Sequence, residues 1–194
     1  MKKKQLSVVA AIVMCLSILA SGTIAYFTAE DRVHNVITSS GVDIAIKEWQ
    51  EIDGDLVEYP DDPVETMPGN SVSKVVTIEN LDADAYIRAR IEVVVELADG
   101  TKITDPAALK GIIDVTVESE KWLQKDGDAV WYYYGEAVEK GESTEALISE
   151  VVFSGPNMGN EYQNATITVT VYAQAVQVAN NGASALKAAG WPAE

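Results

Sequence analysis

Residues 164–178 have the sequence Asn-Ala-Thr-Ile-Thr-Val-Thr-Val-Tyr-Ala-Gln-Ala-Val-Gln-Val, and this stretch carries the strongest evidence for the fold class. Apolar residues alternate with more polar ones, so that Ala165, Ile167 and Val169 fall on one face. Because successive side chains of a β-strand point to opposite faces, a period of two predicts a long, half-buried strand.

Residues 85–97 show the same alternation and predict a second long strand. Turn sequences such as Asp53-Gly54 and Asp99-Gly100 separate further strand candidates. The pattern predicts an all-β fold, an antiparallel β-sandwich of jelly-roll type, with an Ig-like topology as the alternative. We expect one domain over residues 26–194. The shorter strands are expected at 41–49, 71–80, 112–120, 129–134 and 144–153, and short helices at 105–110 and 183–189.

The composition excludes several classes of protein. The chain has 194 residues, 14 basic against 30 acidic side chains, a net charge of −16, one Cys and one His. Nucleic-acid binding needs clustered Lys and Arg, so we expect no nucleic-acid partner. A single Cys excludes a disulfide scaffold, and a single His removes most zinc and Ser-His chemistry.

Residues 1–25 have the features of an export signal. Lys2, Lys3 and Lys4 precede an apolar stretch at residues 6–20, and small residues follow up to Ala25. This order predicts a signal peptide cut between Ala25 and Tyr26, whereas a permanent N-terminal anchor is the alternative. Removing residues 1–25 takes away three of the 14 basic residues and none of the 30 acidic ones, which leaves a net charge of −19 and no Cys. We expect contact with the membrane only through the uncleaved signal.

Motifs for catalysis are missing from the sequence. No HExxH or GxSxG motif occurs, and we expect no catalytic residue, no metal site and no cofactor. Acidic residues gather between positions 51 and 62, but their spacing does not fit an EF-hand loop. We therefore interpret this segment as a solvated acidic loop.

Aromatic residues gather between positions 122 and 134. On a strand, Trp131 and Tyr133 face one way, and Tyr132 and Tyr134 face the other. Trp131 and Tyr133 are candidates for an aromatic surface that binds a glycan or a protein. Packing in the core and across strands is the alternative.

Short motifs in a fixed order resemble those of a known family. Residues 22–28 read Gly-Thr-Ile-Ala-Tyr-Phe-Thr, and residues 35–44 read Asn-Val-Ile-Thr-Ser-Ser-Gly-Val-Asp-Ile. Further matches are Met-Pro-Gly at 67–69, Ala-Tyr-Ile-Arg-Ala-Arg-Ile at 85–91, Trp-Tyr-Tyr-Tyr at 131–134 and Val-Tyr-Ala-Gln-Ala-Val-Gln at 171–177. The chain thus resembles the TasA/CalY (camelysin-like) family of exported Gram-positive proteins, whose signals are cut by a SipW-type signal peptidase.

The resemblance implies a jelly-roll sandwich and a role as a biofilm-matrix fibre subunit. In such fibres the N-terminal segment completes the sheet of the next subunit, a form of β-strand addition. The donor would be residues 26–46, with pairing inside its own domain as the alternative. Its apolar candidates are Phe27, Val33, Val36, Val42, Ile44 and Ile46.

These observations lead to one expectation of function and two alternatives. We expect a non-enzymatic structural protein, secreted to the cell surface or extracellular matrix, that forms homo-oligomers or fibres and meets a SipW-type peptidase during export. The first alternative is a monomeric surface adhesin. The second is a secreted metallopeptidase, a class that the resemblance suggests and that no motif in this sequence supports.

Overall fold

The computed structural model describes residues 27–31, 35–38, 41–117 and 119–192. Within these residues the chain forms two β-sheets and a few short helical turns. Sheet A contains β1 (Phe27–Asp31), β2 (Asn35–Thr38), β5 (Val64–Thr66), β7 (Ala85–Glu96), β8 (Lys102–Ile103), β10 (Trp122–Lys125), β11 (Asp128–Tyr134) and β13 (Thr166–Gln177). Sheet B contains β3 (Ile44–Ile52), β4 (Asp55–Glu58), β6 (Ser71–Asn80), β9 (Ile113–Val115) and β12 (Ile148–Phe153). The helical turns are α2 (Pro106–Leu109), η1 (Asn160–Tyr162) and η2 (Ala185–Lys187).

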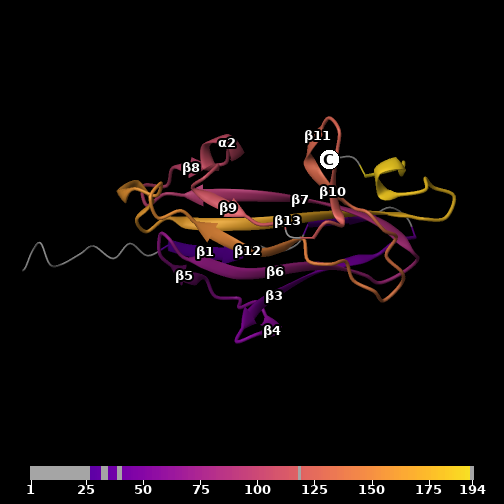
Figure 1. Cartoon of the computed structure of the whole chain (residues 1–194), viewed down its shortest axis with the longest axis horizontal. Coiled ribbons are helices and arrows are strands. Elements are labelled where there is room, and N and C mark those ends of the chain that lie inside the picture. Colours follow the sequence, from indigo (N-terminus) through magenta and orange to yellow (C-terminus); the bar gives the residue numbers. More distant parts are fainter. Residues whose placement is uncertain (1–26, 32–34, 39–40, 118, 193–194) are drawn as a thin grey trace, which may run out of the picture.

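Strands β7 and β13 form the centre of sheet A. Each has 12 residues, and they pair antiparallel along their whole length, from Glu96 opposite Thr166 to Ala85 opposite Gln177. The strand order of the sheet is β10-β11-β7-β13-β1-β5, and Figure 1 shows β7 and β13 running side by side. The two strands predicted from alternation are therefore confirmed.

The main core lies between the two sheets. Alternate residues of β13, among them Ile167 and Val171, meet residues of sheet B such as Ile78 and Ile148. These side chains are almost completely shielded from water, and burial of apolar surface is the main force that holds two such layers together.

The structure confirms the all-β fold with two sheets, a sandwich of the predicted class, while the jelly-roll topology stays a prediction. One feature differs from a purely antiparallel arrangement. Strands β1 and β2 both run parallel to β13. A parallel pair needs a crossover rather than a tight turn, and here nearly the whole domain separates the two partners in the sequence.

The predicted short helix at 105–110 is confirmed, and the one at 183–189 is only a single turn. The Asp105 side chain accepts a hydrogen bond from the Ala107 amide, and proline begins the helix, as the sequence indicates. Near the C-terminus, the Asn181 side chain binds backbone groups of Gly182 and Ala189, and this closes a loop around η2. An Asn side chain that bonds to nearby backbone competes with the helix.

Two hairpins project from opposite sides of the sandwich. Figure 1 shows the β3–β4 hairpin on one side and the β10–β11 hairpin on the other, with the C-terminal segment near the latter. None of the helices in the described part of the chain has the length and apolar character of a membrane span.

Candidate functional site

The second edge of β13 is filled by the N-terminal part of the chain. Four residues of β1 pair with β13 from Thr166 to Val169, and four residues of β2 pair with it from Tyr172 to Ala175. On the other side β13 is paired with β7 over all twelve residues. Strands β1 and β2 therefore satisfy backbone groups of β13 that would otherwise form a long open edge.

Strand β5 depends on the same segment. It pairs antiparallel with β1, with Phe27 opposite Thr66 and Ala29 opposite Val64. In the described part of sheet A, β1 is the only strand next to β5. Strand β1 thus lies in a position bounded by β13 on one side and β5 on the other, which we call the β13–β5 slot.

The structure divides the predicted donor segment between the two sheets. Phe27 lies in β1 and Val36 in β2, both in sheet A. Ile44 and Ile46 belong to β3 of sheet B, which pairs with β6, and Val42 lies two residues before β3. These three side chains are buried in the main core. Val33 and the predicted cleavage residues Ala25 and Tyr26 lie outside the described residues.

A second cluster lies on the outer face of sheet A, away from the main core. Tyr86 of β7, Trp131 and Tyr133 of β11, and Val176 of β13 form a separate apolar group with Ala185 of η2. Alternation explains this grouping, because the intervening residues of these strands, such as Ile87 and Ala175, point into the main core. The outer face is thus partly covered by the C-terminal segment of the same chain.

Arg88 is the centre of this cluster. Its guanidinium carbon lies 4.2 Å from the centre of the Trp131 ring and 4.8 Å from that of Trp191. Its Nε and Nη2 donate to Oε1 of Gln174 at 2.9 and 2.6 Å, and its Nη1 donates to the Tyr133 hydroxyl at 3.2 Å. One cation therefore links β7, β11, β13 and the C-terminal segment.

The hydrogen-bond chain continues from Tyr133 to Asp128 at the start of β11. The Tyr133 hydroxyl donates to Asp128 Oδ2 at 2.9 Å, and the amides of Val130 and Trp131 donate to Oδ1 at 3.1 Å. Burial acts to raise the pKa of Asp128, but these hydrogen bonds outweigh burial and hold the pKa below its ordinary value. Burial is also the main reason why the pKa of Tyr133 is raised.

The predicted aromatic surface at Trp131 and Tyr133 is not accessible in this structure. Both rings face the same side, as the alternation predicts, but their exposed fractions are only 6% and 3%. Trp191 packs against Tyr133 at 5.7 Å between ring centres and covers this face. Strand alternation gives the face of a side chain and not what lies over it, so the sequence did not show this cover.

Sequence reasoning also missed Arg88, Gln174 and Trp191 as members of the cluster. Arg88 lies in β7 and Gln174 in β13, and these strands pair with Arg88 opposite Gln174. Residues opposite each other in a sheet share a face, so this pairing brings Arg88 and Gln174 together. The sequence alone does not reveal which strands pair.

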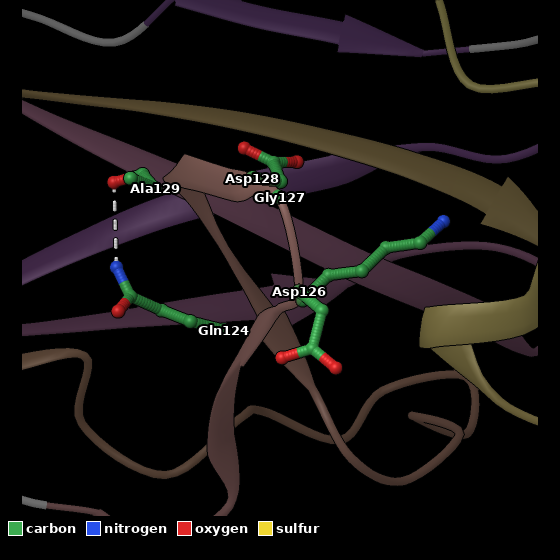
Figure 2. Close-up of a pocket in the computed structure, with 6 residues that line it drawn as sticks. Gln124, Asp126, Gly127, Asp128 and Ala129 are labelled. Carbon is green, nitrogen blue, oxygen red and sulfur yellow. Dashed lines mark hydrogen bonds between the residues drawn. The ribbon is translucent and has the colours of Figure 1, made fainter.

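A shallow hollow of about 390 Å³ lies at the turn of the β10–β11 hairpin, lined by residues 124–129. Figure 2 shows that the side chains of Asp126 and Asp128 point apart and that Gln124 reaches Ala129, with Nε2 donating to the carbonyl oxygen at 3.3 Å. The Asp128 carboxylate already accepts three hydrogen bonds. These residues do not bring two reactive groups together.

In the part of the chain that the structure describes, no group of three or more His, Cys, Asp or Glu residues is arranged to hold a metal ion. His34 lies outside the described residues. The acidic residues between 51 and 62, expected in a solvated loop, are all exposed, but four of them lie in the β3–β4 hairpin and only Asp61 and Asp62 follow it.

A comparison of the chain with protein-family models, with curated proteins and with solved structures finds no match in any of the three.

Proposed function

We propose that the protein is an exported, non-enzymatic structural protein of the cell surface or extracellular matrix, and that its subunits join into fibres by exchanging the N-terminal segment. The observation that supports this proposal best is the β13–β5 slot. Strand β1 completes sheet A there through short ladders, four residue pairs with β13 and three with β5, and β2 adds four pairs with β13.

Exchange of this segment preserves the same contacts. An identical segment from a neighbouring chain would offer the same backbone groups to β13 and β5. Each subunit would give one segment and receive another. Such a head-to-tail contact forms a closed ring only if successive rotations bring the last subunit back to the first. Otherwise the contact extends into a filament.

The exchanged segment is residues 27–38 rather than the whole of 26–46. Strand β3 pairs with β6 from Ile44 to Trp49, and moving it would open the main core. Gly41 lies between β2 and β3 and has a φ of 90°, a backbone conformation that other residues adopt at a cost. Gly41 is the hinge in this proposal, since it precedes the first buried residue of sheet B.

Net charge keeps the unassembled chains apart. Without residues 1–25 the chain has a net charge of −19, and such like-charged subunits repel at low ionic strength. Repulsion of this kind opposes non-specific contact, while a specific strand exchange can overcome it. Export follows from the signal-like residues 1–25 and from the resemblance to substrates of a SipW-type signal peptidase.

The adhesin alternative requires an accessible aromatic surface. Trp131 and Tyr133, the residues that would form it, are covered by the C-terminal segment in this structure. We therefore favour the structural role, for which the N-terminal segment supplies a physical mechanism.

Electron microscopy of two proteins, together with peptide binding to the shorter one, tests the proposal. The protein without residues 1–25 should form fibres, and the variant that also lacks 27–38 should not. A synthetic peptide of residues 27–38 should bind that shorter variant and restore its lost stability, whereas the same peptide with Ala29→Pro should not, because proline removes a backbone donor. If the longer protein stays monomeric at high concentration while circular dichroism shows a folded domain, the proposal fails.

A further inference from the structure

In the part of the chain that the structure describes, no strand pairs with the outer edge of the β3–β4 hairpin. Strand β4 is the terminal strand of sheet B, and all four of its residues are exposed. The described residues include seven exposed large apolar side chains, and three of them lie in this hairpin: Ile52 at 48%, Leu56 at 55% and Val57 at 39%. We call residues 51–58 the β4 edge. An exposed edge strand with apolar residues is a template for pairing with another chain.

The turn of the hairpin establishes which backbone groups point outward. Asp53 and Gly54 have φ values of 55° and 90°, which is the signature of a two-residue type I′ turn. Ile52 and Asp55 flank this turn and are paired, and pairs in an antiparallel ladder alternate between those that exchange hydrogen bonds and those that do not.

Two contacts show which residues of β4 direct their backbone groups toward β3 and which direct them outward. The Glu51 amide donates to the Ser73 hydroxyl at 2.9 Å, so it points toward β6 and away from β4. The Tyr59 amide donates to the Glu48 carbonyl oxygen at 3.1 Å, which extends the ladder one residue beyond β4. Leu56 is opposite Glu51, so the backbone groups of Leu56 point to the outer side of β4. The backbone groups of Glu58, two residues further along the strand, point the same way.

The charge around this edge is of one sign. Glu51, Asp53, Asp55 and Glu58 are all exposed. No Lys or Arg of the described residues forms an ion pair with any of the four; the nearby Lys47 and Lys74 are paired with Glu79 and Glu48 instead.

A second copy of this chain does not suit the edge at neutral pH. If β4 paired with β4 of another molecule, the four carboxylates of Asp55 and Glu58 from the two chains would gather along one short ladder, and like charges close together repel. The whole molecule adds to this repulsion through its net charge of −16, or −19 without residues 1–25. A cationic partner has the opposite effect, because its charges complement the edge.

The order of side chains defines the partner further. Along β4 the order is acidic, apolar, apolar, acidic, at Asp55, Leu56, Val57 and Glu58. Residues opposite each other share a face, so the matching strand has the order basic, apolar, apolar, basic. We propose that the β4 edge binds an extended polypeptide segment of this pattern as an added strand. This binding site is separate from the β13–β5 slot and does not depend on fibre formation.

Fluorescence anisotropy with two labelled peptides tests the proposal on the purified exported protein. One peptide contains Lys-Val-Ile-Lys between Thr residues, and the other contains Glu-Val-Ile-Glu. The protein should bind the basic peptide roughly tenfold or more tightly than the acidic one, since two cross-strand charge pairs change from repulsive to attractive. Failure to bind either peptide would overturn the proposal.

Two variants separate strand addition from general attraction of opposite charges. The double variant Asp55→Lys/Glu58→Lys should reverse the preference, whereas Asp126→Lys/Glu139→Lys, with the same change of net charge at other exposed positions, should keep it. Leu56→Pro removes an outward amide and should weaken binding of the basic peptide by roughly tenfold. If the control pair abolishes the preference as fully as the β4 pair does, the site is not at this edge.

Discussion

Replacement of Arg88 by Met tests how the outer face of sheet A is held together. Arg88 donates two hydrogen bonds to Gln174, whose exposed fraction is 3%, and its guanidinium lies between the rings of Trp131 and Trp191. Met keeps the length of the side chain and removes the charge and all of the donors. Gln174 Oε1 then loses both of its donors from Arg88 in a buried position.

The expected loss of stability follows from these contacts. A buried acceptor without its partner costs about 1–3 kcal/mol, and each partly buried cation–π contact contributes about 1 kcal/mol. These contributions are not additive, so we expect a loss of about 3 kcal/mol in the free energy of unfolding. With a urea dependence of about 2 kcal/mol/M, the unfolding midpoint should fall by about 1.5 M.

A double-mutant cycle shows whether the buried acceptor is the cause. Arg88→Met/Gln174→Met removes both polar partners, so it should be less destabilising than the sum of the two single variants. Circular dichroism in urea gives all four free energies. A midpoint shift of less than about 0.3 M for Arg88→Met, or strict additivity in the cycle, would refute the reasoning.

Three further predictions concern acid sensitivity, a buried amide and assembly. The pKa of Asp128 is lowered in the folded protein, so its stabilising effect is present at neutral pH and is lost as the pH falls below about 4. Asp128→Asn should therefore reduce the loss of stability between pH 7 and pH 3, measured by urea unfolding. The control Asp126→Asn should leave this loss as it is in the parent. Asn80 is fully buried, and its Nδ2 donates to the carbonyl oxygens of Ala83 and Val138, so Asn80→Ala should lower the free energy of unfolding by about 2–3 kcal/mol, and a thermal midpoint equal to that of the parent would contradict this. Fibre growth, followed by light scattering, should speed up in high salt and near the isoelectric point of about 4.3; growth that slows under both conditions would show that charge repulsion does not limit assembly.

The long central strands were predictable from the sequence, while the edges of the sheets were not. Strands β7 and β13 each show a period of two over twelve residues, and such a pattern has no good alternative structure. Strands β1 and β2 are only five and four residues long, and their parallel partner is distant in the sequence. Propensity over so short a segment cannot identify a partner that the tertiary fold provides.

The candidate sites show the same contrast. Alternation correctly put Trp131 and Tyr133 on one face, but the cover over that face comes from Trp191, which follows the loop closed by Asn181. The alanine-rich sequence around Ala185 predicts a helix by propensity, and the side-chain bonds of Asn181 favour the loop. The division of residues 26–46 between two sheets also depends on pairing with β13 and β6, which one sequence does not reveal.

Disulfide cross-linking of the β13–β5 slot tests strand exchange most directly. Thr28 of β1 is opposite Glu65 of β5 in an antiparallel pair, a spacing that a disulfide can bridge. One chain carries Thr28→Cys and the other Glu65→Cys, and both lack residues 1–25, which contain the single native Cys. The two chains are mixed, allowed to assemble and oxidised, with both cysteines in a single chain as the control for cross-linking within a monomer. The account predicts covalent dimers from the mixed chains after assembly and no fibres from the control chain if it is oxidised first. Fibres without covalent dimers from the mixed chains would show that each N-terminal segment stays in its own subunit, and would contradict the account.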